Sequence, residues 1–181
     1  MDVQTGIVER VTDQADALLV AVDRAVTAAR AAAIPVVYVR VAFRLGAPEA
    51  SRRNRAFARS AANPAMGVDH PATRIHAAVA PRTGDIEVVK KRVSAFAGSD
   101  LEVILRSLDA RSLVLSGIAT SGVVLSTLRQ AADLDYELTV LRDACADADP
   151  EVHRVLLDKV FPRQADMVDT VDWVAGLVPS P

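Results

Sequence analysis

The stretch of residues 112–134 constrains the fold more than any other part of the sequence. Residues 112–116 (SLVLS) have the composition of a buried strand, and apolar residues recur at helical spacing from about Ser121 to Leu134. Gly117 begins the short turn between them. A strand that leads directly into a helix is part of the crossover connection that parallel strands require. This stretch therefore predicts a parallel sheet covered by helices.

The same alternation of strands and helices runs along the rest of the chain. Further strands are predicted at residues 36–41, 86–90, 136–141 and 165–169. Further helices are predicted at residues 15–33, from the capping box at residues 99–102, and from the Asp149-Pro150 pair to about Phe161. Residues 43–84 are the least regular part, and we expect them to form loops over one edge of the sheet.

This order of elements predicts a three-layer αβα, Rossmann-like domain with a mainly parallel sheet. A chain of 181 residues, 51% of them hydrophobic, is long enough for one complete core, and no linker or internal repeat divides it. Only 4% of the residues are aromatic, so the core must be mainly aliphatic. We therefore expect a single domain over residues 1–181.

Composition excludes several classes of partner. A net charge of -2 gives no electrostatic footprint for nucleic acid, and the basic run at residues 52–55 is interpreted as a solvated face. No apolar run is long enough for a membrane span. Cys145 is the only cysteine, and the first residues lack the features of a signal peptide. We expect a cytoplasmic protein without nucleic-acid or membrane partners.

Four segments carry a resemblance to a known family. They are, in chain order, MDVQ at residues 1–4, KKRVSAFAGSD at residues 90–100, GIATSGVVLSTLR at residues 117–129 and DACADADPEVHRVLLDKVF at residues 143–161. Together they resemble the isochorismatase-like hydrolases of the cysteine hydrolase superfamily. The resemblance covers nearly the whole chain and implies that family's fold. Because Asp2 is almost the first residue, the first strand is expected to be truncated.

The resemblance implies a catalytic pair, Asp2 and Lys90. Lys91 is the neighbouring alternative, but alternation along a strand sends adjacent side chains to opposite faces, so only one of the two lysines can enter the site. The spacing to the Ser-Ala-Phe motif favours Lys90. A carboxylate beside an ammonium in a partly dry cleft can exchange protons with a substrate. Without the resemblance, a structural ion pair would be the simpler interpretation.

The resemblance also places Val123 where these hydrolases carry their cysteine nucleophile. Valine has no lone pair, so the usual thiol chemistry is closed to this chain. The resemblance implies substrate contacts from Ile118, Ala119, Gly122 and Phe96, with a cis peptide bond between Ile118 and Ala119. Backbone N–H groups near Gly122 and Val123 are the expected oxyanion donors.

Other nucleophiles are weaker candidates than the missing cysteine. We interpret Thr120 and Ser121 as helix caps, Ser126 as bonded to backbone, and Cys145 as a small buried group.

Two functions from different classes follow. The first is a hydrolase that acts on a small molecule without a cysteine nucleophile, with Asp2 protonating a vinyl ether and Lys90 stabilising charge. The alternative is a catalytically silent relative that serves as a ligand-binding or interaction module. An open pocket lined by Asp2 and Lys90 favours chemistry, whereas a pocket closed by Val123 and Phe96 favours silence. A third possibility is a cysteine-type amidase with an unrecognised nucleophile. It requires Ser121 or Cys145 to face Asp2.

Cofactors and partners are expected to be few. Similar nicotinamidases carry an Asp-x-His pair after the strand matching residues 36–41, but this chain has Ala42-Phe43-Arg44 there. His70, His76 and His153 have no metal-ligand spacing, so we expect no metal and no cofactor. His153 is interpreted as a surface or core-edge residue. The resemblance implies a homo-oligomer, a dimer or tetramer, and the apolar face of residues 123–134 either meets a partner or covers the sheet.

Overall fold

The computed structural model describes residues 1–177, and its strands form two parallel sheets. The strands are β1 (Val37–Val41), β2 (Ile86–Lys90), β3 (Ser112–Ile118), β4 (Glu137–Ala146) and β5 (Asp166–Val168). β1 pairs with β2, and the second sheet has the order β3-β4-β5. Every pairing is parallel. The predicted parallel sheet is therefore confirmed.

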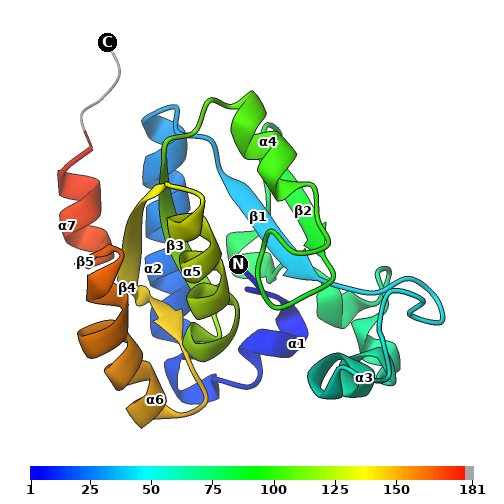
Figure 1. Ribbon diagram of the computed structural model, residues 1–181. Helices are drawn as coiled ribbons and strands as arrows, with labels where there is room; N and C mark the ends of the chain where they lie inside the picture. Colours follow the sequence, from blue (N-terminus) through cyan, green and yellow to red (C-terminus); the bar gives the residue numbers. More distant parts are fainter. Residues whose placement is uncertain (178–181) are drawn as a thin grey trace.

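Met1 and Asp2 lie between β1 and β3 and join the two sheets. The Asp2 amide donates to the Val39 carbonyl at 2.7 Å, and the Ile118 amide donates to the Met1 carbonyl at 3.1 Å. The Met1 ammonium donates to Ser116 at 2.9 Å. Figure 1 shows the N-terminus in this central position. Residues 1–3 occupy the place of a central strand without forming a regular one.

Helices cover both sides of this layer of strands. The α-helices are α1 (Thr5–Val8), α2 (Thr12–Ala31), α3 (Arg55–Ala61), α4 (Leu101–Ser107), α5 (Leu125–Asp133), α6 (Pro150–Val155) and α7 (Thr170–Ala175). α2 and α7 contact one face of β4, and α5 contacts the other (Figure 1). The three-layer αβα architecture is confirmed. Within residues 1–177, no helix is long and apolar enough to cross a membrane.

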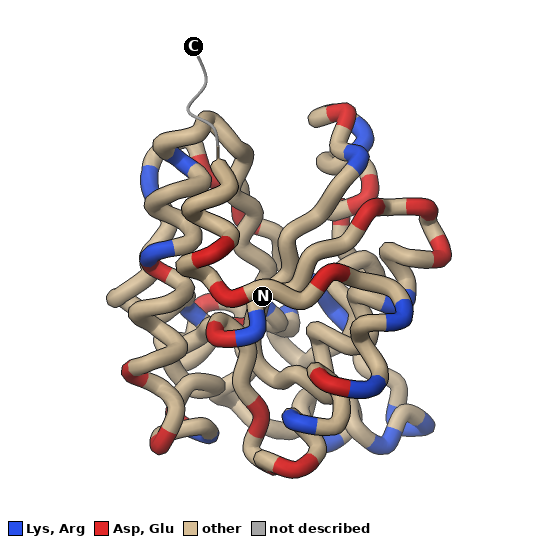
Figure 2. Tube along the Cα trace, turned by 90° about the vertical axis from the view of Figure 1, so that its left-hand side faces the viewer, with Lys and Arg blue, Asp and Glu red and all other residues tan. Residues whose placement is uncertain are grey.

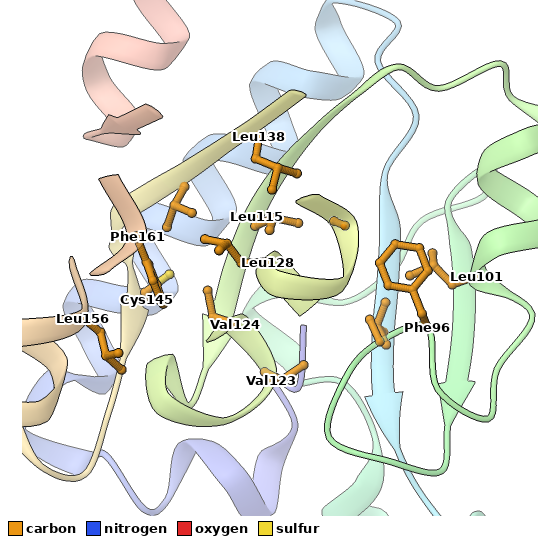
Figure 3. Packing of buried hydrophobic residues seen from close by; sticks show 14 of the residues in the cluster. Phe96, Leu101, Leu115, Val123, Val124, Leu128, Leu138, Cys145, Leu156 and Phe161 are labelled. Carbon is orange, nitrogen blue, oxygen red and sulfur yellow. The ribbon is translucent and has the colours of Figure 1, made fainter. Parts of the chain in front are cut away.

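Side chains on the two faces of β4 pack in two different clusters of the core. Leu138 and Val140 pack in the cluster beneath α5, whereas Leu141 and Ala144 pack in the cluster beneath α2. Figure 3 shows the first cluster, in which Leu128 of α5 points toward the strands. Leu128 is 0% exposed. The apolar face of residues 123–134 thus covers the sheet of its own chain.

The segment of residues 43–84 differs from the predicted loops. It contains α3 and the short 3₁₀ helices η1 (Pro64–Met66), η2 (Pro71–Thr73) and η3 (Ala77–Val79). Side chains just before these turns accept backbone N–H bonds: Asn54, Asn63, His70 and His76. Turns this short are fixed by caps rather than by an apolar period, so the periodicity did not reveal them.

Helical periodicity also misses local irregularities. The helix predicted from Ser121 begins as a π-helical turn, η4 (Thr120–Val124). The helix predicted to reach Phe161 continues from α6 through η5 (Leu156–Val160), a second π-helical turn, and η6 (Phe161–Arg163). π-helical turns are frequent at functional sites, and η4 follows the end of the central strand β3.

Gly117 is required where β3 passes the Met1–Asp2 segment. Its φ is +141°, and a Cβ built at this position would lie 2.0 Å from the Met1 carbonyl oxygen. No side chain fits so close to a backbone oxygen. The glycine therefore permits the close approach that joins the two sheets.

We expect Gly117→Ala to destabilise the protein by at least about 3 kcal/mol, because backbone must move in addition to the strain at positive φ. Gly84→Ala is the matched control: Gly84 has a φ of +99°, but nothing lies within 4 Å of the place that a Cβ would take. It should cost only about 1–2 kcal/mol. Urea unfolding midpoints measure both. Equal losses would mean that the Met1 contact does not constrain the fold.

Candidate functional site

A cavity of about 530 Å³ opens at the carboxyl ends of β1, β2 and β3. Open parallel sheets bind ligands at this edge. The lining brings together most of the site residues predicted from the sequence: Asp2, Lys90, Ile118, Ala119, Gly122 and Val123. The remaining walls are largely apolar side chains from α1, α3 and the segments that follow β1 and β2.

Asp2 and Lys90 form a buried ion pair in this cavity. Lys90 Nζ lies 2.8 Å from Asp2 Oδ2, and their side chains are 2% and 7% exposed respectively. Lys90 also donates to the Arg92 carbonyl at 3.0 Å. The second carboxyl oxygen, Asp2 Oδ1, is buried and has no hydrogen-bond partner within residues 1–177. One oxygen of Asp2 is thus paired with Lys90, while the other is buried and unpartnered among the described residues.

Burial raises the pKa of the Asp2 carboxyl above its ordinary value. The Lys90 ammonium opposes this shift by charge and by hydrogen bonding, but removal from water is the larger effect. Asp2 therefore holds its proton to a higher pH than an exposed aspartate does. Such a carboxyl is suited to donating a proton.

The next residue, Lys91, points elsewhere. It donates to the Ala42 carbonyl at 2.6 Å, and its Nζ lies 3.7 Å from Glu49. The side chains of the two lysines diverge, as expected for neighbours at the end of a strand. Lys90, rather than Lys91, faces Asp2.

The turn after β3 forms one wall of the cavity. The peptide bond between Ile118 and Ala119 is cis, as the resemblance implied. The Ser121 amide donates to Asp147 Oδ2 at 2.7 Å, and the Gly122 amide donates to the Ala119 carbonyl at 3.0 Å. The Gly122 amide, an expected oxyanion donor, is thus already bonded within the turn.

A hydrogen bond between Thr120 and His153 also holds this turn. Thr120 Oγ1 lies 2.8 Å from His153 Nδ1, and Thr120 is 0% exposed. Burial lowers the pKa of the half-buried His153. Neither Thr120 nor Ser121 provides a side-chain cap for η4, contrary to our interpretation of the sequence. Because Thr120 and His153 are 33 residues apart, their spacing gave no signal of the contact.

Cys145 and Phe96 lie outside the cavity lining. Cys145 is 5% exposed, and burial raises the pKa of its thiol to about 12, so the thiol is protonated at neutral pH. Phe96 is 6% exposed and packs in the core, with its ring centroid 6.3 Å from that of Tyr136 (Figure 3). The structure therefore places Phe96 away from the predicted substrate contacts.

The histidines do not converge on a metal site. His70 and His76 each accept a backbone amide at the start of a short 3₁₀ helix. Within residues 1–177, no group of three or more His, Cys, Asp or Glu side chains is arranged to hold a metal ion.

Known proteins are similar to this chain in both sequence and fold. The model of the isochorismatase domain matches residues 1–172. The uncharacterized isochorismatase family protein YecD of Escherichia coli O157:H7 is 35% identical over 136 residues, which cover 75% of this chain and 70% of that protein. The ureidoacrylate amidohydrolase RutB of Caulobacter segnis is 48% identical over 71 residues, 39% of this chain and 30% of that protein.

A solved structure extends the likeness to the fold. An isochorismatase family protein from Burkholderia thailandensis superposes with a TM-score of 0.84 at 26% sequence identity. The superposition covers 97% of this chain and 92% of that one. The fold that forms the cavity is therefore shared with that protein along nearly the whole chain.

We expect His153→Ala to destabilise the protein by about 1–2 kcal/mol, because it leaves the buried Thr120 hydroxyl without a partner. Adding Thr120→Val should cost less in that background than in the wild type, with a coupling energy of about 1 kcal/mol. His153→Asn, which retains a polar atom near the Nδ1 position, should recover part of the loss. Urea unfolding of the wild type, the two single variants and the double variant completes a double-mutant cycle. Strictly additive losses of stability would show that the bond does not stabilise the turn.

Proposed function

The chain belongs to the isochorismatase family, and we propose that it hydrolyses a small molecule without a cysteine nucleophile. The observation that carries this proposal is the buried Asp2–Lys90 pair in an open cavity, with Asp2 Oδ1 unpartnered among the described residues. An oxygen that is buried without a partner costs free energy unless a ligand bonds to it. A substrate atom beside Oδ1 would supply that bond.

We propose acid-catalysed hydrolysis of a vinyl ether. Protonated Asp2 donates its proton to the terminal alkene carbon, and the double-bond electrons form the new C–H bond, leaving an oxocarbenium ion. Water adds to the cationic carbon and loses a proton, and the resulting hemiketal releases the alcohol. The raised pKa of Asp2 supports the proton donation, and the Lys90 ammonium then stabilises the carboxylate that remains.

Nucleophilic catalysis has less support. Val123, at the position that we propose matches the family's cysteine, offers no nucleophile, and the Cys145 thiol is buried with a pKa of about 12. Ser121 is exposed and does not line the cavity. Acyl transfer also needs free N–H groups for an oxyanion, whereas the amide of Gly122, one of the two expected donors, is bonded within the turn.

Small amides are the competing substrate class, because the chain resembles ureidoacrylate amidohydrolases over 71 residues. The other competing function, a silent ligand-binding protein, would fit a pocket closed by Val123 and Phe96. Phe96 does not line the cavity, and the open space beside Asp2 supports chemistry instead. Testing vinyl ethers and small amides in one panel distinguishes these functions.

We expect Asp2→Asn to lower kcat/KM for the vinyl ether by about 100-fold or more, because the proton donor is lost. Isochorismate is the first vinyl ether to test, with products followed by mass spectrometry. Turnover of amides by wild type that is unaffected by Asp2→Asn would contradict the mechanism. If wild type turns over nothing and Val123→Cys gains amidase activity, the silent-relative function is correct.

Asp2→Asn leaves the buried Lys90 ammonium unpaired, which can destabilise the fold. The double variant Asp2→Asn with Lys90→Gln removes both charges and should recover stability without recovering turnover. Circular dichroism and urea unfolding establish that each variant is folded before its rate is compared.

The pH dependence of kcat/KM separates an acid from a base at Asp2. If protonated Asp2 is the reactive form, the rate should be highest at low pH and fall as the pH rises through its raised pKa. A reaction that needs the Asp2 carboxylate as a base would show the opposite limb, rising with pH. Rates measured from about pH 5 to about pH 9 decide the direction, with protein stability followed over the same range.

A further inference from the structure

Two arginines lining the cavity take no part in the proposed chemistry. Arg10 follows α1, and Arg59 lies in the last turn of α3. Both are exposed, and both line the same cavity as Asp2 and Lys90. These four are its only charged side chains among the residues that the structure describes. One acidic side chain thus shares the lining with three basic ones, so the lining has an excess of positive charge whether Asp2 is ionised or protonated.

Within residues 1–177, neither Arg10 nor Arg59 forms an ion pair or a side-chain hydrogen bond. Some arginines elsewhere have acidic partners, such as Arg30 with Asp85 and Arg142 with Asp158, whereas others, such as Arg55, have none among the described residues. An arginine is most strongly bound by a planar anion that accepts two parallel N–H bonds. The guanidinium groups of the two cavity arginines therefore have N–H donors available for such an anion.

The segment that carries Arg59 has a large excess of basic residues. Acidic and basic residues are distributed over much of the molecule (Figure 2), but residues 44–59 include five arginines and a single acid, Glu49. Glu49 lies 3.7 Å from Lys91 and 3.8 Å from Arg44, and its Oε1 accepts the Arg44 amide. The one acid of this segment is therefore already engaged away from Arg59.

α3 holds Arg59 in a defined place beside the cavity. Phe57, two residues earlier in the helix, is buried and packs edge-on against Phe43, with ring centroids 6.0 Å apart. The Arg92 guanidinium lies over the Phe57 ring, with its central carbon 5.4 Å from the ring centroid. The buried Phe57 ring thus anchors the helix from which Arg59 extends beside the cavity.

We propose that Arg10 and Arg59 bind a carboxylate group of the substrate at the exposed end of the cavity. This inference rests on the proposed function, because it assigns the substrate class of the same site. Asp2 and Lys90 form the buried end, apolar residues such as Val41, Met66 and Val93 line the walls, and the arginines lie where solvent enters. The substrate is then a small acid whose reactive group reaches Asp2 while its carboxylate remains at the arginines.

Benzoate and benzamide test this assignment, since they have nearly the same shape and differ in charge. Isothermal titration calorimetry should show benzoate binding at least about 10-fold more tightly than benzamide, as expected for charge-assisted hydrogen bonds. Arg10→Gln and Arg59→Gln should each weaken benzoate binding by about 10-fold. Arg55→Gln is the matched control, because Arg55 is an exposed arginine of α3 that does not line the cavity.

Equal affinity for benzoate and benzamide would overturn the proposal, as would unchanged benzoate binding in Arg59→Gln. Tighter binding of inorganic phosphate than of benzoate would overturn the assignment to carboxylates. Folding of each variant is established from its urea unfolding midpoint. For any substrate identified in the panel, Arg59→Gln should raise KM with little change in kcat, because Arg59 binds the substrate without taking part in the proton transfer.

Calorimetry separates this inference from the proposed hydrolysis. If no substrate of the panel is turned over but benzoate binding depends on Arg10 and Arg59, the hydrolysis fails and the carboxylate site stands. If turnover depends on Asp2 but benzoate binding is indifferent to both arginines, the hydrolysis stands and the carboxylate site fails.

Discussion

The backbone contacts of Met1 and Asp2 are the interaction on which the rest of the structure depends. Through hydrogen bonds to Val39 and Ile118, these two residues connect a two-stranded sheet to a three-stranded one. The same contacts carry the Asp2 side chain to the carboxyl end of β2, where Lys90 meets it. One short segment therefore both completes the layer of strands and assembles the Asp2–Lys90 pair, so that folding and site geometry are coupled.

This coupling explains why a costly buried charge pair is retained. An ion pair removed from water contributes little net stability, because desolvation offsets the attraction. Asp2 is desolvated in this way, and one of its carboxyl oxygens has no hydrogen-bond partner among the described residues. Its pKa is raised as a result of burial. Groups with this combination of burial and perturbed pKa are concentrated at functional sites. The energetics of the pair are thus better matched to proton transfer than to stabilising the fold.

The sequence predicted the regular parts of this structure and missed the irregular ones. Periodicity and strand composition predicted β2 at the observed residues and the start of every other strand to within one residue, because those signals come from the chain itself. The end of β4 was missed, because this strand continues from the predicted Leu141 to Ala146. The pairing of Lys90 with Asp2 followed from a motif resemblance and the alternation of a strand. By contrast, the Thr120–His153 bond and the position of α3 over the cavity depend on tertiary contacts between distant segments. No local pattern encodes them, and the exclusion of Phe96 from the cavity has the same cause.

Val123 and a protonated Asp2 are chemically consistent with each other. Val123 is 2% exposed and adds apolar surface to the cavity that contains Asp2, and burial is the effect that raises the Asp2 pKa. A thiolate at this position would add a negative charge to the cavity besides that of the Asp2 carboxylate. Its formation would require Asp2 or Lys90 to accept the thiol proton. In the mechanism that we propose, valine there leaves Asp2 as the only acidic side chain of the lining among the described residues, and Asp2 keeps its proton for the substrate. If Val123 occupies the position of the family's cysteine, as we propose, this arrangement favours donation of a proton by Asp2 over attack by sulfur.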